Sequence, residues 1–176
     1  MRWISLFLAA AALCFGANEL SNRRAPSFTL PDSNLRDFDI LDYRGKWVLI
    51  DFMKTECPHC AQLTKTLEPL KNKYGAKVQV VYVVIAPPEN QDTVRRYVND
   101  NKVTSPVVFD QGQMTRTYFR LTPQRPSYDT PHLFVIDPMG TIVRDWSWED
   151  KTKTLETPGA LAKELDALIN GAPAKK

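Results

Sequence analysis

The sequence predicts one α/β domain, in which a central mixed β-sheet is flanked by helices on both faces and preceded by an N-terminal β-hairpin extension. Apolar runs typical of buried strands alternate with amphipathic segments at helical spacing, in the order strand, helix, strand, helix, strand, helix. A hairpin pattern and one more amphipathic segment follow. The 176 residues, 43% of them hydrophobic, suffice for one core and are too few for two ordinary domains.

The first elements are a hairpin and a buried strand. Phe28–Leu30 and Leu35–Leu41 flank the turn-forming stretch Pro31–Asn34, which predicts the N-terminal hairpin. Trp47–Met53 is a nearly continuous apolar run, as expected for a strand covered on both faces. One acid, Asp51, interrupts it.

The following elements alternate between helix and strand. A helix is predicted over Pro58–Tyr74, with leucines on one side and Gly75 at its end. Pro69 lies inside this helix and is expected to kink or shorten it. Further elements are predicted at Lys77–Ile85 (strand), Gln91–Asn101 (helix), Val107–Phe109 (strand) and Gly112–Phe119 (helix).

The C-terminal part predicts a second hairpin and a last helix. Leu133–Ile136 and Thr141–Val143 are separated by Asp137–Gly140, the strongest hairpin signal in the chain. The last helix is predicted to begin with Thr157 as its cap and Pro158 at its first position, and to end at Gly171.

The N-terminus has the pattern of a secretory leader. A charged start is followed by the apolar run Trp3–Phe15, which is too short to span a bilayer comfortably. We therefore expect a signal peptide over residues 1–16, a flexible lead-in over 17–25, the domain over 26–171 and a disordered tail over 172–176. The protein is expected in the periplasm or another extracytoplasmic space, without stable membrane insertion after cleavage. It would be membrane-anchored if the leader were retained or if Cys14 were lipidated, although Leu13 fits the lipidation pattern poorly.

Charge and cysteine content narrow the possible functions. Without the leader, lysine and arginine nearly balance aspartate and glutamate, for a net charge of about +2, which argues against a nucleic-acid partner. The mature chain keeps only Cys57 and Cys60, so a disulfide-rich scaffold is excluded.

The motif Cys57-Pro58-His59-Cys60 is the main candidate site. On a helix, positions three apart share one face, at a Cα separation of about 5.5 Å that suits a reversible disulfide. The same spacing also occurs in half of a zinc site, in haem attachment motifs and by chance. A haem attachment motif is excluded, because it needs histidine directly after the second cysteine and here Ala61 follows Cys60. A structural staple remains possible, as does a copper-binding metallochaperone of the same fold that uses both thiols and His59 or His132.

Four further segments strengthen the redox interpretation: Ala25–Asp32, Leu41–Phe52, Thr130-Pro131 and Asp137–Gly140. Together with the C-x-x-C motif they resemble the thioredoxin superfamily, and more closely its exported TlpA-like and redoxin-type members. The resemblance implies a thioredoxin fold and a thiol-disulfide oxidoreductase whose only redox group is the Cys57–Cys60 disulfide. It also implies protein thiol or disulfide substrates, a redox partner protein, and no metal or other cofactor.

The motif residues have distinct predicted roles. Cys57 is placed at the helix N-cap, where free N–H groups and the helix dipole favour an anion, and is the predicted nucleophile. Pro58 suits the first helical turn. His59 is expected to stabilise the thiolate, with an exposed residue of little effect as the alternative. Cys60, one turn deeper, is the predicted resolving thiol.

Three residues outside the motif complete the predicted site. Asp51 matches the buried acid of thioredoxins, which helps to deprotonate the resolving cysteine; the alternative is a carboxylate that caps backbone donors. Pro131 is expected in cis and packed against the disulfide, and Thr130 is expected to pair with an extended substrate. The alternative is a trans proline of an edge strand. His132 is more often structural in such a position.

Several positions depart from the family pattern. Glu56 and Met53 replace aromatic residues that the family usually has around the first cysteine. Arg120–Asp129 is interpreted as an insertion beside the active site. Peroxidase activity is disfavoured because Lys54 occupies the position where peroxiredoxins need threonine. The direction of electron flow stays open: Pro58-His59 favours oxidation or isomerisation, whereas Asp51 and the TlpA-like frame favour reduction.

Overall fold

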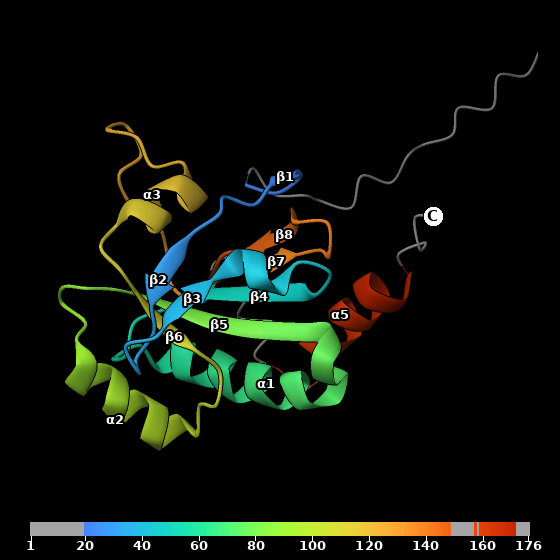
Figure 1. Cartoon of the computed structure of the whole chain (residues 1–176), viewed down its shortest axis with the longest axis horizontal. Helices are drawn as coiled ribbons and strands as arrows, with labels where there is room; N and C mark the ends of the chain where they lie inside the picture. Colours follow the sequence, from blue (N-terminus) through green and yellow to red (C-terminus); the bar gives the residue numbers. More distant parts are fainter. Residues whose placement is uncertain (1–19, 149–156, 158, 172–176) are drawn as a thin grey trace, which may run out of the picture.

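The central sheet has six strands, in the order β1-β8-β7-β4-β5-β6 (Figure 1). The computed structural model describes residues 20–148, 157 and 159–171. Strands β4, β5 and β6 run parallel, whereas β7 is antiparallel to β4 and β8 is antiparallel to both β7 and β1. The strands are β1 (Arg23–Arg24), β4 (Trp47–Phe52), β5 (Val78–Ile85), β6 (Val107–Asp110), β7 (His132–Ile136) and β8 (Thr141–Trp146). The predicted mixed sheet is confirmed.

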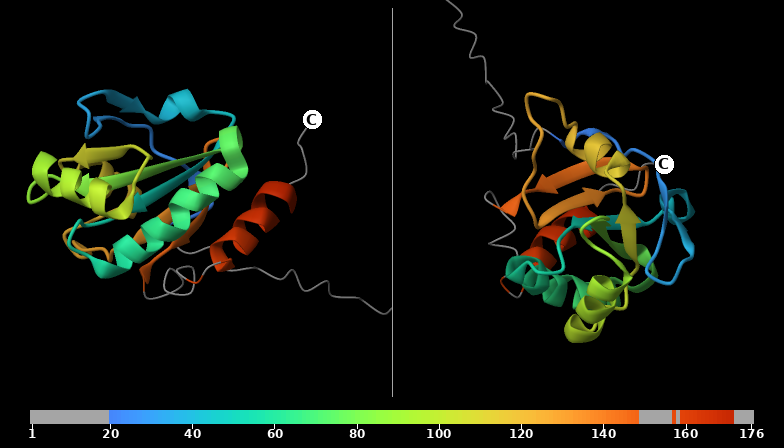
Figure 2. Two further views of the ribbon diagram at one scale, coloured as in Figure 1. Left: turned by 90° about the horizontal axis from the view of Figure 1, so that it is seen from below. Right: turned by 90° about the vertical axis from the view of Figure 1, so that its left-hand side faces the viewer.

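Helices cover both faces of the sheet, as predicted. Figure 1 shows α1, α2 and α5 on one face and α3 with the hairpin β2–β3 on the other, and Figure 2 shows these layers from two further directions. The helices are α1 (Pro58–Tyr74), α2 (Gln91–Asn101), α3 (Gln113–Phe119) and α5 (Ala160–Gly171). The hairpin strands are β2 (Thr29–Pro31) and β3 (Asp37–Asp39), and short 3-10 helices are η1 (Ile40–Tyr43) and η2 (Gly75–Lys77).

Each face of the sheet has its own hydrophobic core. Leu63 and Leu67 of α1 and Leu161 of α5 pack on one face, where Leu49 of β4 is fully buried. Aromatic side chains dominate the other face, beneath α3 and the hairpin. Because successive side chains of a strand point to opposite faces, Asp51 lies on the same face as Leu49, beneath α1.

Some details of the predicted elements differ from the structure. The second hairpin strand is shorter than expected, because Asp39 accepts a hydrogen bond from Leu41 N at 2.8 Å and caps η1. Pro69 does not shorten α1, which continues to Tyr74. The last helix begins at Ala160 and not directly after Thr157, and Pro158 lies outside the described residues.

Strand β1 was not predicted, and its residues fall in the expected flexible lead-in. Arg23 and Arg24 pair with Ile142 and Thr141 of β8. The Arg23 guanidinium also donates to the carbonyl oxygen of Tyr118. Backbone pairing needs no apolar side chains, so the polar side chains of Arg23 and Arg24 gave no sign of this edge strand. From Leu20 onward, the predicted lead-in is part of the fold.

The predicted signal peptide, Cys14 and the predicted tail lie outside the described residues. Within the part of the chain that the structure describes, no helix is long and apolar enough to cross a bilayer.

Candidate active site

The two cysteines lie where β4 leads into α1, at one end of the parallel strands. Cys57 is the N-cap of α1, with extended backbone angles of φ −95° and ψ 113°, and its Sγ accepts a hydrogen bond from Cys60 N at 3.2 Å. Pro58 occupies the first helical turn, where no backbone donor is needed. Both cysteines are free thiols. The geometry places Cys57 where the helix dipole and a backbone N–H both favour a thiolate.

The two thiols differ in exposure. Cys57 is half-buried, whereas Cys60 is fully buried beneath the first turn of α1. Burial raises the pKa of the Cys60 thiol, and the charge of Asp51 and the hydrogen bond to Cys57 raise it further. Cys60 therefore needs a base before it can react, whereas Cys57 is accessible from solvent.

Asp51 is the candidate base. Its side chain is fully buried, and neither carboxylate oxygen has a hydrogen-bond partner among the described residues. Burial raises the pKa of this carboxyl well above its ordinary value, because the charged form loses its hydration. The alternative role, in which Asp51 caps backbone donors, would require a hydrogen bond from a backbone N–H to its carboxylate. No such bond is present in the described part of the chain.

Thr130 and Pro131 lie at the same end of the sheet. The Thr130–Pro131 peptide bond is cis, Thr130 is half-buried and Pro131 is buried. The next residue, His132, pairs with Phe52, the last residue of β4. This register brings the proline loop beside the segment that leads to Cys57.

His132 belongs to the other face of the sheet. Its ring lies 4.8 Å from Phe119 and 4.6 Å from Phe134, measured between centroids, within the aromatic core beneath α3. Cys60 lies in the core on the α1 face. The described residues contain no group of three or more histidine, cysteine, aspartate or glutamate side chains that could hold a metal ion.

His59 contacts an aromatic residue, Trp148, that was not among the predicted site residues. The ring centroids of His59 and Trp148 lie 3.8 Å apart, with an angle of 31° between the planes. Trp146 is 3% exposed in the core, but Trp148 is only half-buried. The only signal in the sequence was an aromatic residue two positions beyond a predicted core tryptophan.

Glu89 is a second residue that sequence reasoning missed. Its carboxylate accepts hydrogen bonds from Thr55 N at 2.8 Å and Thr55 Oγ1 at 2.7 Å, and from Thr93 Oγ1 at 2.6 Å. These bonds join the loop before Cys57 to the first turn of α2. In the sequence Glu89 follows two prolines, between a predicted strand and a predicted helix. An acid in such a connection is usually only solvated, so the sequence gave no sign that Glu89 is buried.

A groove of about 430 Å³ adjoins the loop before Cys57. Its lining includes Lys54 and Glu56 of this loop, and Pro126 and Tyr128 of the predicted insertion. Tyr128 stacks on Phe119 with centroids 4.2 Å apart, which fixes the end of the insertion on the domain. The expected position of Arg120–Asp129 beside the site agrees with this arrangement.

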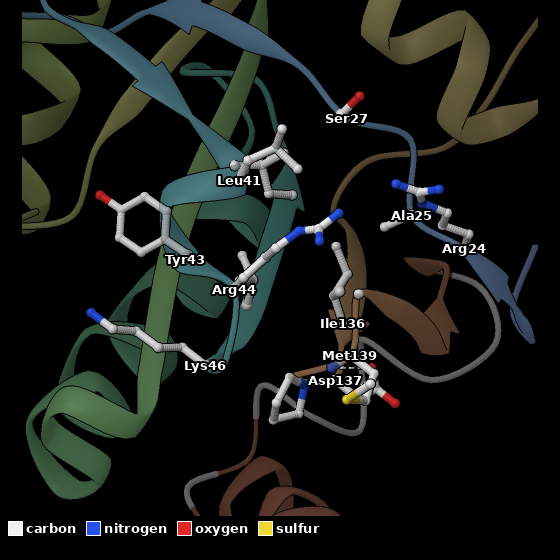
Figure 3. A pocket seen from close by; sticks show the side chains of 14 residues that line it. Arg24, Ala25, Ser27, Leu41, Tyr43, Arg44, Lys46, Ile136, Asp137 and Met139 are labelled. Atoms are coloured by element: carbon white, nitrogen blue, oxygen red, sulfur yellow. Dashed lines mark hydrogen bonds between the residues drawn. The ribbon is translucent and has the colours of Figure 1, made fainter.

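Another cavity lies at the opposite end of β4, away from the thiols (Figure 3). It is about 40 Å³ in volume and is lined by the turn between β7 and β8 and by η1. Arg44 extends into it from one side, while Arg24 lies on the other (Figure 3). None of the predicted site residues lines this cavity.

Comparison with known proteins agrees with this geometry. Residues 21–144 match the AhpC/TSA family. The chain belongs to this family. Among curated relatives, the thiol-disulfide oxidoreductase ResA of Bacillus thuringiensis is 27% identical over 134 residues, which cover 76% of this chain and 73% of the relative. The thioredoxin-like protein YneN of Bacillus subtilis is 28% identical over 121 residues, covering 68% and 67%.

A solved structure supports the fold. The thioredoxin domain of a thiol-disulfide oxidoreductase from Bacteroides vulgatus superposes with a TM-score of 0.61 at 21% identity, over 77% of this chain and 95% of that domain. The predicted thioredoxin fold and the predicted redoxin-type resemblance are confirmed. This AhpC/TSA family member is a thioredoxin-like thiol-disulfide oxidoreductase.

Proposed function

We propose that this protein is an exported enzyme that exchanges disulfides with protein thiols through Cys57 and Cys60. One observation carries the proposal: an accessible thiol at a helix N-cap lies one turn from a buried thiol, and the buried acid whose charge acts on that thiol, Asp51, has a raised pKa. The leader pattern of residues 1–16 supports export.

The proposed reaction has two exchange steps. The Cys57 thiolate attacks one sulfur of a substrate disulfide; that S–S bond breaks, a mixed disulfide forms, and the departing substrate sulfur takes up a proton. Cys60 then gives its proton to the Asp51 carboxylate and attacks the Cys57 sulfur. The second substrate thiol leaves, and Cys57–Cys60 becomes a disulfide. Two electrons have passed to the substrate, and the reverse sequence oxidises a dithiol.

Thr130 and Pro131 are proposed to receive the substrate backbone. Pro131 is buried directly before β7, which begins at His132, and the half-buried Thr130 precedes it outside the strand. An extended peptide can add to such a segment by main-chain hydrogen bonds. This would present a substrate sulfur to Cys57.

An equilibrium with glutathione tests the proposed redox couple. In mixtures of reduced and oxidised glutathione, the chain without its leader is expected to lose two thiols together, with one midpoint and an intramolecular disulfide detected by mass spectrometry. The equilibrium constant ranks the protein among reductants or oxidants. Failure to form the disulfide at any ratio would overturn the proposal.

The insertion is proposed to select the protein substrate. Replacing 122–126 by two glycines removes Pro126 from the lining of the groove and keeps Tyr128 on Phe119. We expect kcat/KM for a protein disulfide to fall about five- to tenfold, since docking contacts are lost, while the glutathione equilibrium is unchanged. Met139→Ala, at an exposed turn beyond the other end of β7, serves as the control. If the shortened variant had the same kcat/KM as the wild type for each of several protein substrates, this role would be contradicted.

A further inference from the structure

The contact between His59 and Trp148 joins two parts of the chain that are remote in sequence. His59 is exposed on the first turn of α1, two residues after Cys57, and Trp148 lies two residues beyond the end of β8. Aromatic rings in proteins usually pack with centroids 4.5–7 Å apart. At 3.8 Å and 31° the two ring faces overlap, so the indole covers one face of the imidazole.

The sheet explains how Trp148 reaches the active site. Trp146 pairs with Leu133 of β7 and is 3% exposed in the core, so the end of β8 is firmly placed. Leu133 lies two residues after Pro131, which places the continuation of β8 at the level of the proline loop. Trp148 is therefore delivered by the sheet to the same end of the molecule as Cys57.

The position before the first cysteine makes this contact more significant. Glu56 is exposed there and provides no aromatic surface beside the thiol. Trp148, which follows the end of β8, brings an aromatic ring to the first turn of α1.

We propose that Trp148 is a positioning residue of the redox centre, whose indole holds the His59 imidazole at the start of α1 and thereby increases the stability of the Cys57 thiolate. The inference rests on the proposed role of Cys57 as the nucleophile. An exposed histidine has several accessible rotamers, and a stacked indole favours one of them. Held in the helical turn that begins at Cys57, the imidazole adds a hydrogen-bond donor to the surroundings of the thiolate. A more stable thiolate makes the reduced protein more stable and the couple more oxidising.

The glutathione equilibrium measures this effect. Trp148→Ala is expected to lower the equilibrium constant for reduction of the Cys57–Cys60 disulfide by about three- to tenfold, since the stack is lost. Trp148→Phe keeps an aromatic face and is expected to stay within about twofold of the wild type. Met139→Ala, remote from the site, should leave the constant unchanged.

A double-mutant cycle shows whether Trp148 acts through His59. In a His59→Gln background, Trp148→Ala is expected to change the constant by less than about twofold, since the partner ring is gone. An equal loss in both backgrounds, or no loss in the wild-type background, would overturn the inference. Failure of the proposed function looks different, because the wild-type protein would then form no Cys57–Cys60 disulfide at all.

Discussion

Replacing Cys57 by serine is expected to abolish turnover of a protein disulfide, with a loss of at least about 10³-fold in kcat. A serine hydroxyl at the N-cap keeps the acceptor for Cys60 N but cannot act as a sulfur nucleophile. Cys60 cannot replace it, because that thiol is fully buried and its pKa is raised. The measurement is the rate of insulin reduction with excess dithiothreitol as electron donor.

Cys60→Ser is the matched variant, and its expected outcome is different. Cys57 still attacks the substrate, but the mixed disulfide cannot be resolved from within the protein. We therefore expect a covalent adduct with the substrate, visible by mass spectrometry and released by dithiothreitol. Normal turnover by Cys57→Ser, or the absence of an adduct with Cys60→Ser, would contradict the assigned roles.

The alternating pattern of the sequence was enough to predict the sheet and the helices that face it. Apolar runs such as Trp47–Met53 and the leucines of α1 report burial directly, because the hydrophobic effect acts on each of them locally. Strand β1 escaped prediction because Arg23 and Arg24 join the sheet through backbone hydrogen bonds, which side-chain polarity does not reveal.

The candidate site was predicted where its chemistry is local in sequence. Cys57 and Cys60 share one helical turn, and Asp51 was recognisable as an acid within an apolar strand. Trp148 and Glu89 act across long sequence separations, on His59 and Thr55, and only the packing of the elements brings these pairs together. A pattern within one segment contains no information about such contacts.

Asp51 is expected to make opposite contributions to activity and stability. In the folded protein its pKa is raised well above the ordinary value of about 3.9, so the folded state binds the proton more tightly than the unfolded chain. Its favourable contribution to stability is complete below pH about 4 and is lost as the pH rises through the raised pKa. Above that pH the fold must hold a buried carboxylate without a hydrogen-bond partner among the described residues.

Asp51→Asn is therefore expected to stabilise the protein at pH 8, by about 1–3 kcal/mol in the free energy of unfolding, while the difference disappears near pH 4. Urea unfolding at several pH values measures it. Asp32→Asn provides a control of opposite sign: burial raises the pKa of Asp32, but hydrogen bonds from the backbone N–H groups of Arg36 and Asn34 lower it overall. That variant should be less stable than the wild type at pH 8, with the difference decreasing as the pH falls.

The same Asp51→Asn substitution is expected to slow the resolving step by about 10²-fold, because Cys60 loses the group that accepts its proton. The first step, attack by Cys57, should change little, so the mixed disulfide should accumulate transiently in stopped-flow or acid-quench experiments. The loss should be smallest at high pH, where hydroxide can deprotonate a buried thiol without help. A variant that is more stable and resolves the mixed disulfide at the wild-type rate would show that the buried carboxyl has no part in the reaction. Slow resolution together with higher stability at pH 8 would show that the fold retains a destabilising acid because Cys60 needs a base.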